Sequence, residues 1–151
     1  LLVAAERLTV WGALRDLVVP RRSPTAARLD RAVDVAGIGH LLDRRTSELS
    51  EGERKLVGLC RALVTDPRVL LLDEPAAGLD TGESRQLGAR LRAVVDAGTG
   101  VLLIDHDMDL VLDVCDVVHV VDGGRLIAGG TPAEVRGDER VVAAYLGVDA
   151  Q

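Results

Sequence analysis

The chain has 151 residues, of which 48% are hydrophobic, a content typical of a folded domain rather than a disordered segment. Its formal net charge is −6 at pH 7, which argues against a nucleic-acid groove because binding a polyanion needs clustered Lys and Arg. No apolar run approaches the roughly 20 residues that span a bilayer, so any membrane association is expected to be peripheral.

The first part of the chain, residues 1–49, is predicted to be helical. Residues 25–36 carry apolar side chains at helical spacing, with charged residues between them. Pro20 and Pro24 separate this helix from an earlier predicted one around Trp11. The region is therefore expected to form a small helical lobe.

From residue 67 onward, short apolar strands alternate with helices, a pattern that favours a parallel sheet with helical crossovers. Residues 69–72 and 101–104 are predicted strands, buried and central because they are short and continuously apolar. An amphipathic helix is predicted between them, at residues 81–97. The fold class is therefore α/β.

The last third of the chain is predicted to hold a helix, a hairpin and two short helices. The helix covers residues 109–115, and Asp122-Gly123 separates two apolar runs, 117–121 and 125–128, as a hairpin turn does. Residues 131–146 are expected to form two short helices that Gly137 splits.

Residues 50–53, Ser-Glu-Gly-Glu, fit a capping box at the start of a helix that runs to about Val64. One interpretation is simply a well-capped helix. The other is an anion site, in which Gly52 allows close approach and the free amides of the first turn bind phosphate. Glu51 and Glu53 count against phosphate unless their carboxylates point away, so local chemistry leaves both interpretations open.

Asp73 and Glu74 follow the first predicted strand, at the edge of a parallel sheet where ligands bind. Adjacent acids at such a place can divide the work: Asp73 can hold Mg²⁺ while Glu74 acts as general base on a water. The alternative is a turn with two solvated acids.

His106 lies just beyond the second predicted strand, where it could come beside these acids and contact a γ-phosphate. A lone histidine there is more often an ordinary loop residue. The flanking Asp105 and Asp107 could be helix caps, and Asp80 before Thr81 is also a good N-cap.

A phosphate-cradling loop of the form G-x-x-x-x-G-K-[ST] is not present in the sequence. The only lysine is Lys55, which Leu56 follows. Because the chain begins at Leu1 and its only methionine is Met108, we expect a C-terminal fragment that holds half of an ATP site.

In combination these motifs resemble the ATP-binding cassette (ABC) ATPases of transporters. Residues 49–53 resemble the family signature, 68–74 its Walker B strand, 77–80 its D-loop and His106 its switch histidine. Glu51 and Glu53 replace a glycine and a glutamine that are frequent in the signature. The resemblance implies a partial P-loop NTPase fold, with residues 1–48 in the helical subdomain and residues 49–151 in the core, which ends with the C-terminal hairpin and tail.

Within the family, the sequence is similar to the ATP-binding subunits of branched-chain amino acid importers. The segments that carry this similarity are DEPAAGLD, IDHDMDLV and the tail GTPAEV followed by AAYLG. Cassettes for urea uptake and lipopolysaccharide export share much of this tail and remain alternatives, as does a non-catalytic cassette-like interaction protein.

The resemblance implies a mechanism in which two cassettes, identical or different, pair head to tail around ATP and Mg²⁺. Signature residues 50–53 of one subunit contact the nucleotide of the other. The resemblance makes Glu74 the general base and Asp73 the Mg²⁺ ligand. His106 contacts the γ-phosphate, and Asp80 communicates across the dimer.

The implied partners are a second cassette, transmembrane permease subunits and, indirectly, a periplasmic or extracellular solute-binding protein. The implied location is cytoplasmic, on the inner face of the plasma membrane. We expect the isolated fragment to be inactive as an ATPase and to expose apolar surface at one edge of its sheet.

Overall fold

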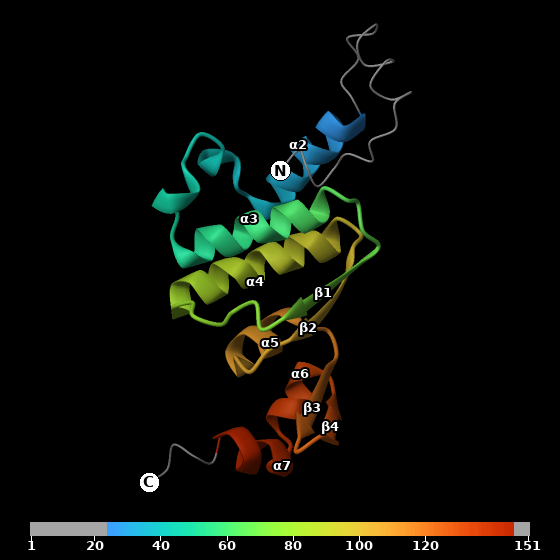
Figure 1. The fold of residues 1–151 in the computed structure, drawn as a ribbon. Helices are drawn as coiled ribbons and strands as arrows, with labels where there is room; N and C mark the ends of the chain where they lie inside the picture. The colour runs from blue at the N-terminus through green and yellow to red at the C-terminus, as the bar shows by residue number, and fades with distance from the viewer. Residues whose placement is uncertain (1–23, 147–151) are drawn as a thin grey trace, which may run out of the picture.

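The structure is a computed structural model that describes residues 24–146 (Figure 1). The predicted helix around Trp11 lies outside the described residues. Along the described chain, helices at one end pack against two parallel strands, and a hairpin with short helices lies at the other end.

The helical part begins with α2 (Pro24–Ala36), which confirms the predicted helix, and continues with α3 (Glu51–Leu63). The prediction of a helical region up to residue 49 is wrong between them, where only the 3-10 turns η2 (Gly39–Leu41) and η3 (Thr46–Glu48) form. Gly37, at φ +66°, ends α2, and residues 42–48 are all exposed, so no apolar stripe supports a longer helix there.

Two parallel strands, β1 (Val69–Asp73) and β2 (Gly100–Ile104), are joined by the crossover helix α4 (Thr81–Asp96). Their register pairs Asp73 with Ile104, so both strands end at the same edge. The predicted parallel sheet with a helical crossover is confirmed.

The prediction that both strands are buried is wrong for one face of the sheet. Leu70 is 6% exposed and packs in the core with α2, α3 and α4, whereas Leu71 is 73% exposed. Successive side chains of a strand point to opposite faces, and the helices cover only one face of this sheet. Apolar surface is exposed, but on one face of the sheet rather than at one edge as predicted, by Leu71 together with Val69, Leu102 and Ile104.

After β2 come α5 (Met108–Val114) and a hairpin of β3 (Val118–Asp122) and β4 (Arg125–Gly130), as predicted. Gly123 and Gly124 form the two-residue turn with φ of 53° and 77°, values that the type I′ turn of a hairpin requires. The chain continues through α6 (Pro132–Arg136), α7 (Glu139–Val141) and the π-helical turn η4 (Val142–Leu146), and Gly137 separates α6 from α7 as predicted.

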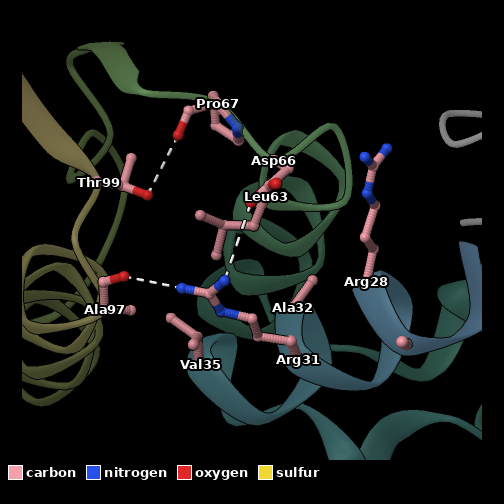
Figure 2. Close-up of a pocket in the computed structure, with 10 residues that line it drawn as sticks. Arg28, Arg31, Ala32, Val35, Leu63, Asp66, Pro67, Ala97 and Thr99 are labelled. Atoms are coloured by element: carbon pink, nitrogen blue, oxygen red, sulfur yellow. Dashed lines mark hydrogen bonds and ion pairs between the residues drawn. The ribbon is translucent and has the colours of Figure 1, made fainter. Parts of the chain in front are cut away.

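A pocket of about 220 Å³ lies where the helical lobe meets the sheet, between α2, the end of α3 and the turn before β2 (Figure 2). Arg31 reaches from α2 and donates to the Ala97 carbonyl at 2.8 Å, while the Thr99 hydroxyl donates to the Pro67 carbonyl at 3.3 Å. The first contact fixes α2 to the turn before β2, the second joins that turn to the chain before β1, and neither involves a predicted site residue.

Candidate functional site

The two acids after β1 lie at the carboxyl edge of the sheet, as the sequence predicts. Asp73 is the last residue of β1 and is exposed beside Ile104. The Glu74 amide donates to the Ile104 carbonyl at 2.7 Å, which extends the β1–β2 pairing by one residue. Glu74 is therefore anchored through its backbone while its side chain remains exposed.

The backbone of Glu74 adopts a left-handed conformation, with φ of +46°. Residues other than glycine rarely adopt this conformation, which costs about 1–3 kcal/mol and persists only where neighbouring contacts impose it. Such strain concentrates at functional sites, so its occurrence at the predicted base is informative.

His106 follows β2, so this histidine and Glu74 come after neighbouring strands at the same edge of the sheet. Both residues line the same hollow of about 830 Å³ along β2 and the start of the hairpin. The side chain of His106 is 72% exposed, with Nδ1 3.7 Å from Asp105 Oδ1. The imidazole is therefore accessible to a ligand from the hollow.

Asp105 does not act as the helix cap that the sequence suggested. Its side chain is fully buried and accepts the Ala76 amide at 2.9 Å, across 29 residues of sequence. It also accepts the amides of His106 at 2.8 Å and Asp107 at 3.0 Å. The carboxylate thus ties the loop that carries His106 to the turn that follows Glu74.

Asp107 is the N-cap of α5, as proposed from sequence, and accepts the Leu110 amide at 3.1 Å. It also accepts the Ser84 hydroxyl at 2.7 Å, which joins the loop to α4. Burial raises the pKa of Asp107, but the hydrogen bonds from Ser84, Leu110 and Asp109 outweigh this effect and leave the pKa below its ordinary value.

The predicted capping box at the start of α3 is present. The Ser50 hydroxyl accepts the Glu53 amide at 3.2 Å, and Glu53 accepts the Ser50 amide at 2.8 Å. The two neighbouring carboxylates are each engaged by an arginine: Glu51 pairs with Arg54, whose hydrogen bond and charge hold the pKa of Glu51 below its usual value, and Glu53 pairs with Arg44 at 3.1 Å.

A third carboxylate contacts the donors of this turn. Glu83 Oε1 accepts the Ser50 hydroxyl at 2.9 Å and the Gly52 amide at 3.2 Å. Gly52 is buried, and a Cβ there would come within 2.9 Å of the Glu83 carboxyl carbon. The start of α3 therefore binds an anionic group, here supplied by the first turn of α4.

Asp80 is the N-cap of α4, where its carboxylate accepts the amides of Gly82 at 2.7 Å and Glu83 at 2.8 Å. This confirms the capping interpretation of Asp80. Since Asp80 orients the first turn that carries Glu83, it also contributes indirectly to the contact between α4 and the start of α3.

The suitability of the site for Mg²⁺ depends on Asp73. Within residues 24–146, no group of three or more His, Cys, Asp and Glu side chains could hold a metal by itself. Mg²⁺ in phosphoryl-transfer sites keeps several waters and needs only one or two carboxylates besides the phosphates. The exposed carboxylate of Asp73 fits that requirement.

None of the helices within residues 24–146 is long and apolar enough to cross a membrane.

Comparison with known proteins identifies the family. The sequence pattern of the family described as ABC transporter matches residues 4–77, and that described as branched-chain amino acid ATP-binding cassette transporter matches residues 125–151. The chain belongs to the ATPase family of ABC transporters. The first match ends in the turn that follows Glu74, and the second covers β4 and the tail.

Two kinds of curated relative resemble the cassette equally. The lipopolysaccharide export system ATP-binding protein LptB of Escherichia coli K12 is 40% identical over 148 residues, covering 95% of this chain and 61% of LptB. The high-affinity branched-chain amino acid transport ATP-binding protein LivG of Salmonella typhimurium is 39% identical over 154 residues, covering 97% of this chain and 60% of LivG. The chain thus spans about three fifths of the length of these relatives.

Solved structures of ABC-transporter cassettes share the fold. The ADP conformation of the cassette MJ1267 superimposes with a TM-score of 0.74 and 28% identity over 96% of this chain and 59% of its own. The structure of cbiO1 from Clostridium perfringens, described as part of the ABC transporter complex cbiONQ, superimposes with a TM-score of 0.67 and 32% identity over 92% of this chain and 55% of that one. The predicted P-loop NTPase fold of the ABC type is confirmed.

Two residues of this region were missed from sequence. Asp105 was considered only as a helix cap, and Glu83 has no signal beyond being an acid in the first turn of a helix. Both act across about 30 residues of sequence, so only the register of β1 with β2 and the packing of α3 on α4 reveal them.

Proposed function

We propose that the chain forms part of the ATP-hydrolysing subunit of an ABC transporter for branched-chain amino acids. The observation that carries the proposal is the arrangement of Glu74 and His106, which line one hollow at the edge where β1 and β2 end. Ligands bind at this edge in open parallel sheets.

In the proposed reaction, Glu74 orients a water and accepts its proton while His106 contacts the γ-phosphate. Asp73 is the residue that would hold Mg²⁺, which neutralises charge on the phosphates when it is bound. Catalysis of this kind depends on positioning, so the anchored backbone of Glu74 supports its role as base.

The signature residues 50–53 are proposed to contact the nucleotide of a second cassette, with Asp80 near the same interface. Ser50 and Gly52 already bind the carboxylate of Glu83, which supports their suitability for an anion. Glu51 and Glu53 are engaged by arginines, so their charge opposes a phosphate less than the sequence alone suggests. An arriving phosphate must displace Glu83.

A phosphate-binding loop is not among these 151 residues, so the proposal concerns an assembly in which sequence outside them supplies it. Within this assembly, residues 24–48 belong to the helical subdomain and residues 49–146 to the core. The proposed partners are a second cassette and transmembrane permease subunits, with a solute-binding protein acting indirectly, on the cytoplasmic face of the plasma membrane.

The proposed solute is a branched-chain amino acid because residues 125–151 match the pattern described for that class of cassette. Export of lipopolysaccharide is the second candidate, supported by the 40% identity to LptB.

Two assays test the proposal on the complete reading frame that contains this chain. The purified product is expected to hydrolyse MgATP, while the 151 residues alone are expected to bind it poorly and not turn it over. Disruption of the reading frame is expected to abolish uptake of labelled leucine, isoleucine or valine. Absence of turnover in the complete product would contradict the ATPase, and unchanged uptake with failed lipopolysaccharide export would favour the second candidate.

A further inference from the structure

The turn that carries Glu74 is attached to the sheet edge at two points. On one side, the Glu74 amide donates to the Ile104 carbonyl at 2.7 Å. On the other, the Ala76 amide donates to Asp105 Oδ2 at 2.9 Å. Pro75 lies between these anchors and has no amide hydrogen to contribute. The second anchor is a contact between the backbone of this turn and a side chain 29 residues away.

The same carboxylate also fixes the backbone at His106. Asp105 Oδ1 accepts the amides of His106 and Asp107, while Oδ2 accepts that of Ala76. Its side chain has no exposed surface, so water does not substitute readily for any of the three bonds. One buried group thereby sets the relation between the turn after Glu74 and the loop of His106.

We propose that Asp105 is a positioning residue for the hydrolytic reaction, which holds Glu74 in its left-handed conformation and at a fixed distance from His106. This inference rests on the proposed function. The strained φ of +46° at Glu74 requires external contacts, and the Asp105 bond to Ala76 is one of the two that flank it. Asp105 itself does not touch the substrate.

The substitution Asp105→Asn isolates this role. All three partners of Asp105 are backbone N–H groups, which can only donate a hydrogen bond. In either orientation of the Asn side chain, its NH₂ group therefore faces at least one of these N–H groups and cannot accept its hydrogen bond. The matched control is Asp107→Asn on the other side of His106. There the Ser84 hydroxyl can reverse its hydrogen bond and donate or accept as needed, while the remaining oxygen still caps α5.

The test uses the complete reading frame, with Glu74→Gln measured in parallel. Asp105→Asn is expected to lower kcat for ATP about 10- to 100-fold while KM changes less than about threefold, because misplacement of the base affects the chemical step. Asp107→Asn is expected to retain kcat. In the 151-residue chain, Asp105→Asn is expected to speed hydrogen exchange at the Ala76 amide.

The variant Val135→Ala distinguishes a purely structural effect, because it removes a side chain that is 1% exposed in the C-terminal cluster and makes no hydrogen bond to the turn after Glu74 or the loop of His106. This variant is expected to lower Tm without lowering kcat. Unchanged kcat in Asp105→Asn, or an equal loss of kcat in Val135→Ala at matched Tm, would overturn the positioning role while leaving the ATPase intact. A parent that does not hydrolyse ATP would overturn the proposed function and the positioning role together.

Discussion

At the scale of single residues, the carboxylates of this chain have different roles that their immediate sequence does not distinguish. Asp107 and Asp80 cap helices within three residues of themselves. Asp105 and Glu83 instead bind backbone amides about 30 residues away, on neighbouring elements. The acids at the carboxyl edge thus divide into those that build the site and those, Asp73 and Glu74, that remain exposed to a ligand.

The contact of Glu83 with the start of α3 gives a first prediction. Glu83→Ala leaves the Gly52 amide and the Ser50 hydroxyl without this acceptor, so we expect the free energy of unfolding to fall by about 1 kcal/mol. Glu83→Gln keeps an oxygen in place and is expected to remain near the parent. Urea unfolding of the 151-residue chain measures both, and equal stability of Glu83→Ala and the parent would show that the contact contributes nothing.

At the scale of secondary structure, the helix ends are fixed by side-chain caps. Thr131 and Glu134 form a second capping box at α6, and the hydrogen bonds of Thr131 hold the pKa of Glu134 below its ordinary value. Asp138 caps the short α7 and pairs with Arg140 at 2.7 Å. Short helices such as these need caps because they have few internal hydrogen bonds.

The cap of α7 gives a prediction about pH. Hydrogen bonds and charge from Arg140 lower the pKa of Asp138 from 3.8 to about 2. A pKa that is lower in the folded state stabilises the fold above pH 3.8, and this contribution is lost as pH falls from 3.8 toward 2. Asp138→Asn is therefore expected to flatten the pH dependence of Tm in this window and nowhere above it. A parallel displacement of the whole curve would contradict the assignment.

The order and type of the elements were predictable from residues that act locally. Apolar spacing in residues 25–36 and 81–97 gave α2 and α4, and Asp122-Gly123 gave the hairpin turn. The position of Asp73 and Glu74 at the carboxyl edge of the sheet was predictable because the ends of β1 and β2 follow from the same apolar pattern. The bonds from Ala76 to Asp105 and from Gly52 to Glu83 were not predictable, because they depend on strand register and helix packing.

At the scale of the whole molecule, the described chain has helices on one face of its sheet and open apolar side chains on the other. Leu71 and Leu102 are paired in the register of β1 and β2 and are 73% and 55% exposed. Apolar side chains on adjacent strands, next to unpaired strand edges, favour association between molecules.

We therefore expect the 151-residue chain to self-associate through this face. The double substitution Leu71→Thr and Leu102→Thr is expected to reduce association with little change in unfolding free energy, because both side chains already lie in solvent. Leu70→Thr is the control, since its side chain is 6% exposed and its loss is expected to destabilise the fold by about 2–5 kcal/mol. Sedimentation velocity and urea unfolding measure both effects; unchanged association in the double variant would exclude this face.

The central claim is that the edge where β1 and β2 end carries out ATP hydrolysis with Glu74 as its base. It is tested most directly by measuring MgATP binding and turnover together in Glu74→Gln of the complete reading frame. The account predicts that ATP affinity stays within about threefold of the parent while turnover falls at least about 100-fold, since Gln retains the shape of the side chain but cannot accept the proton. Equal turnover in the variant and the parent would contradict it.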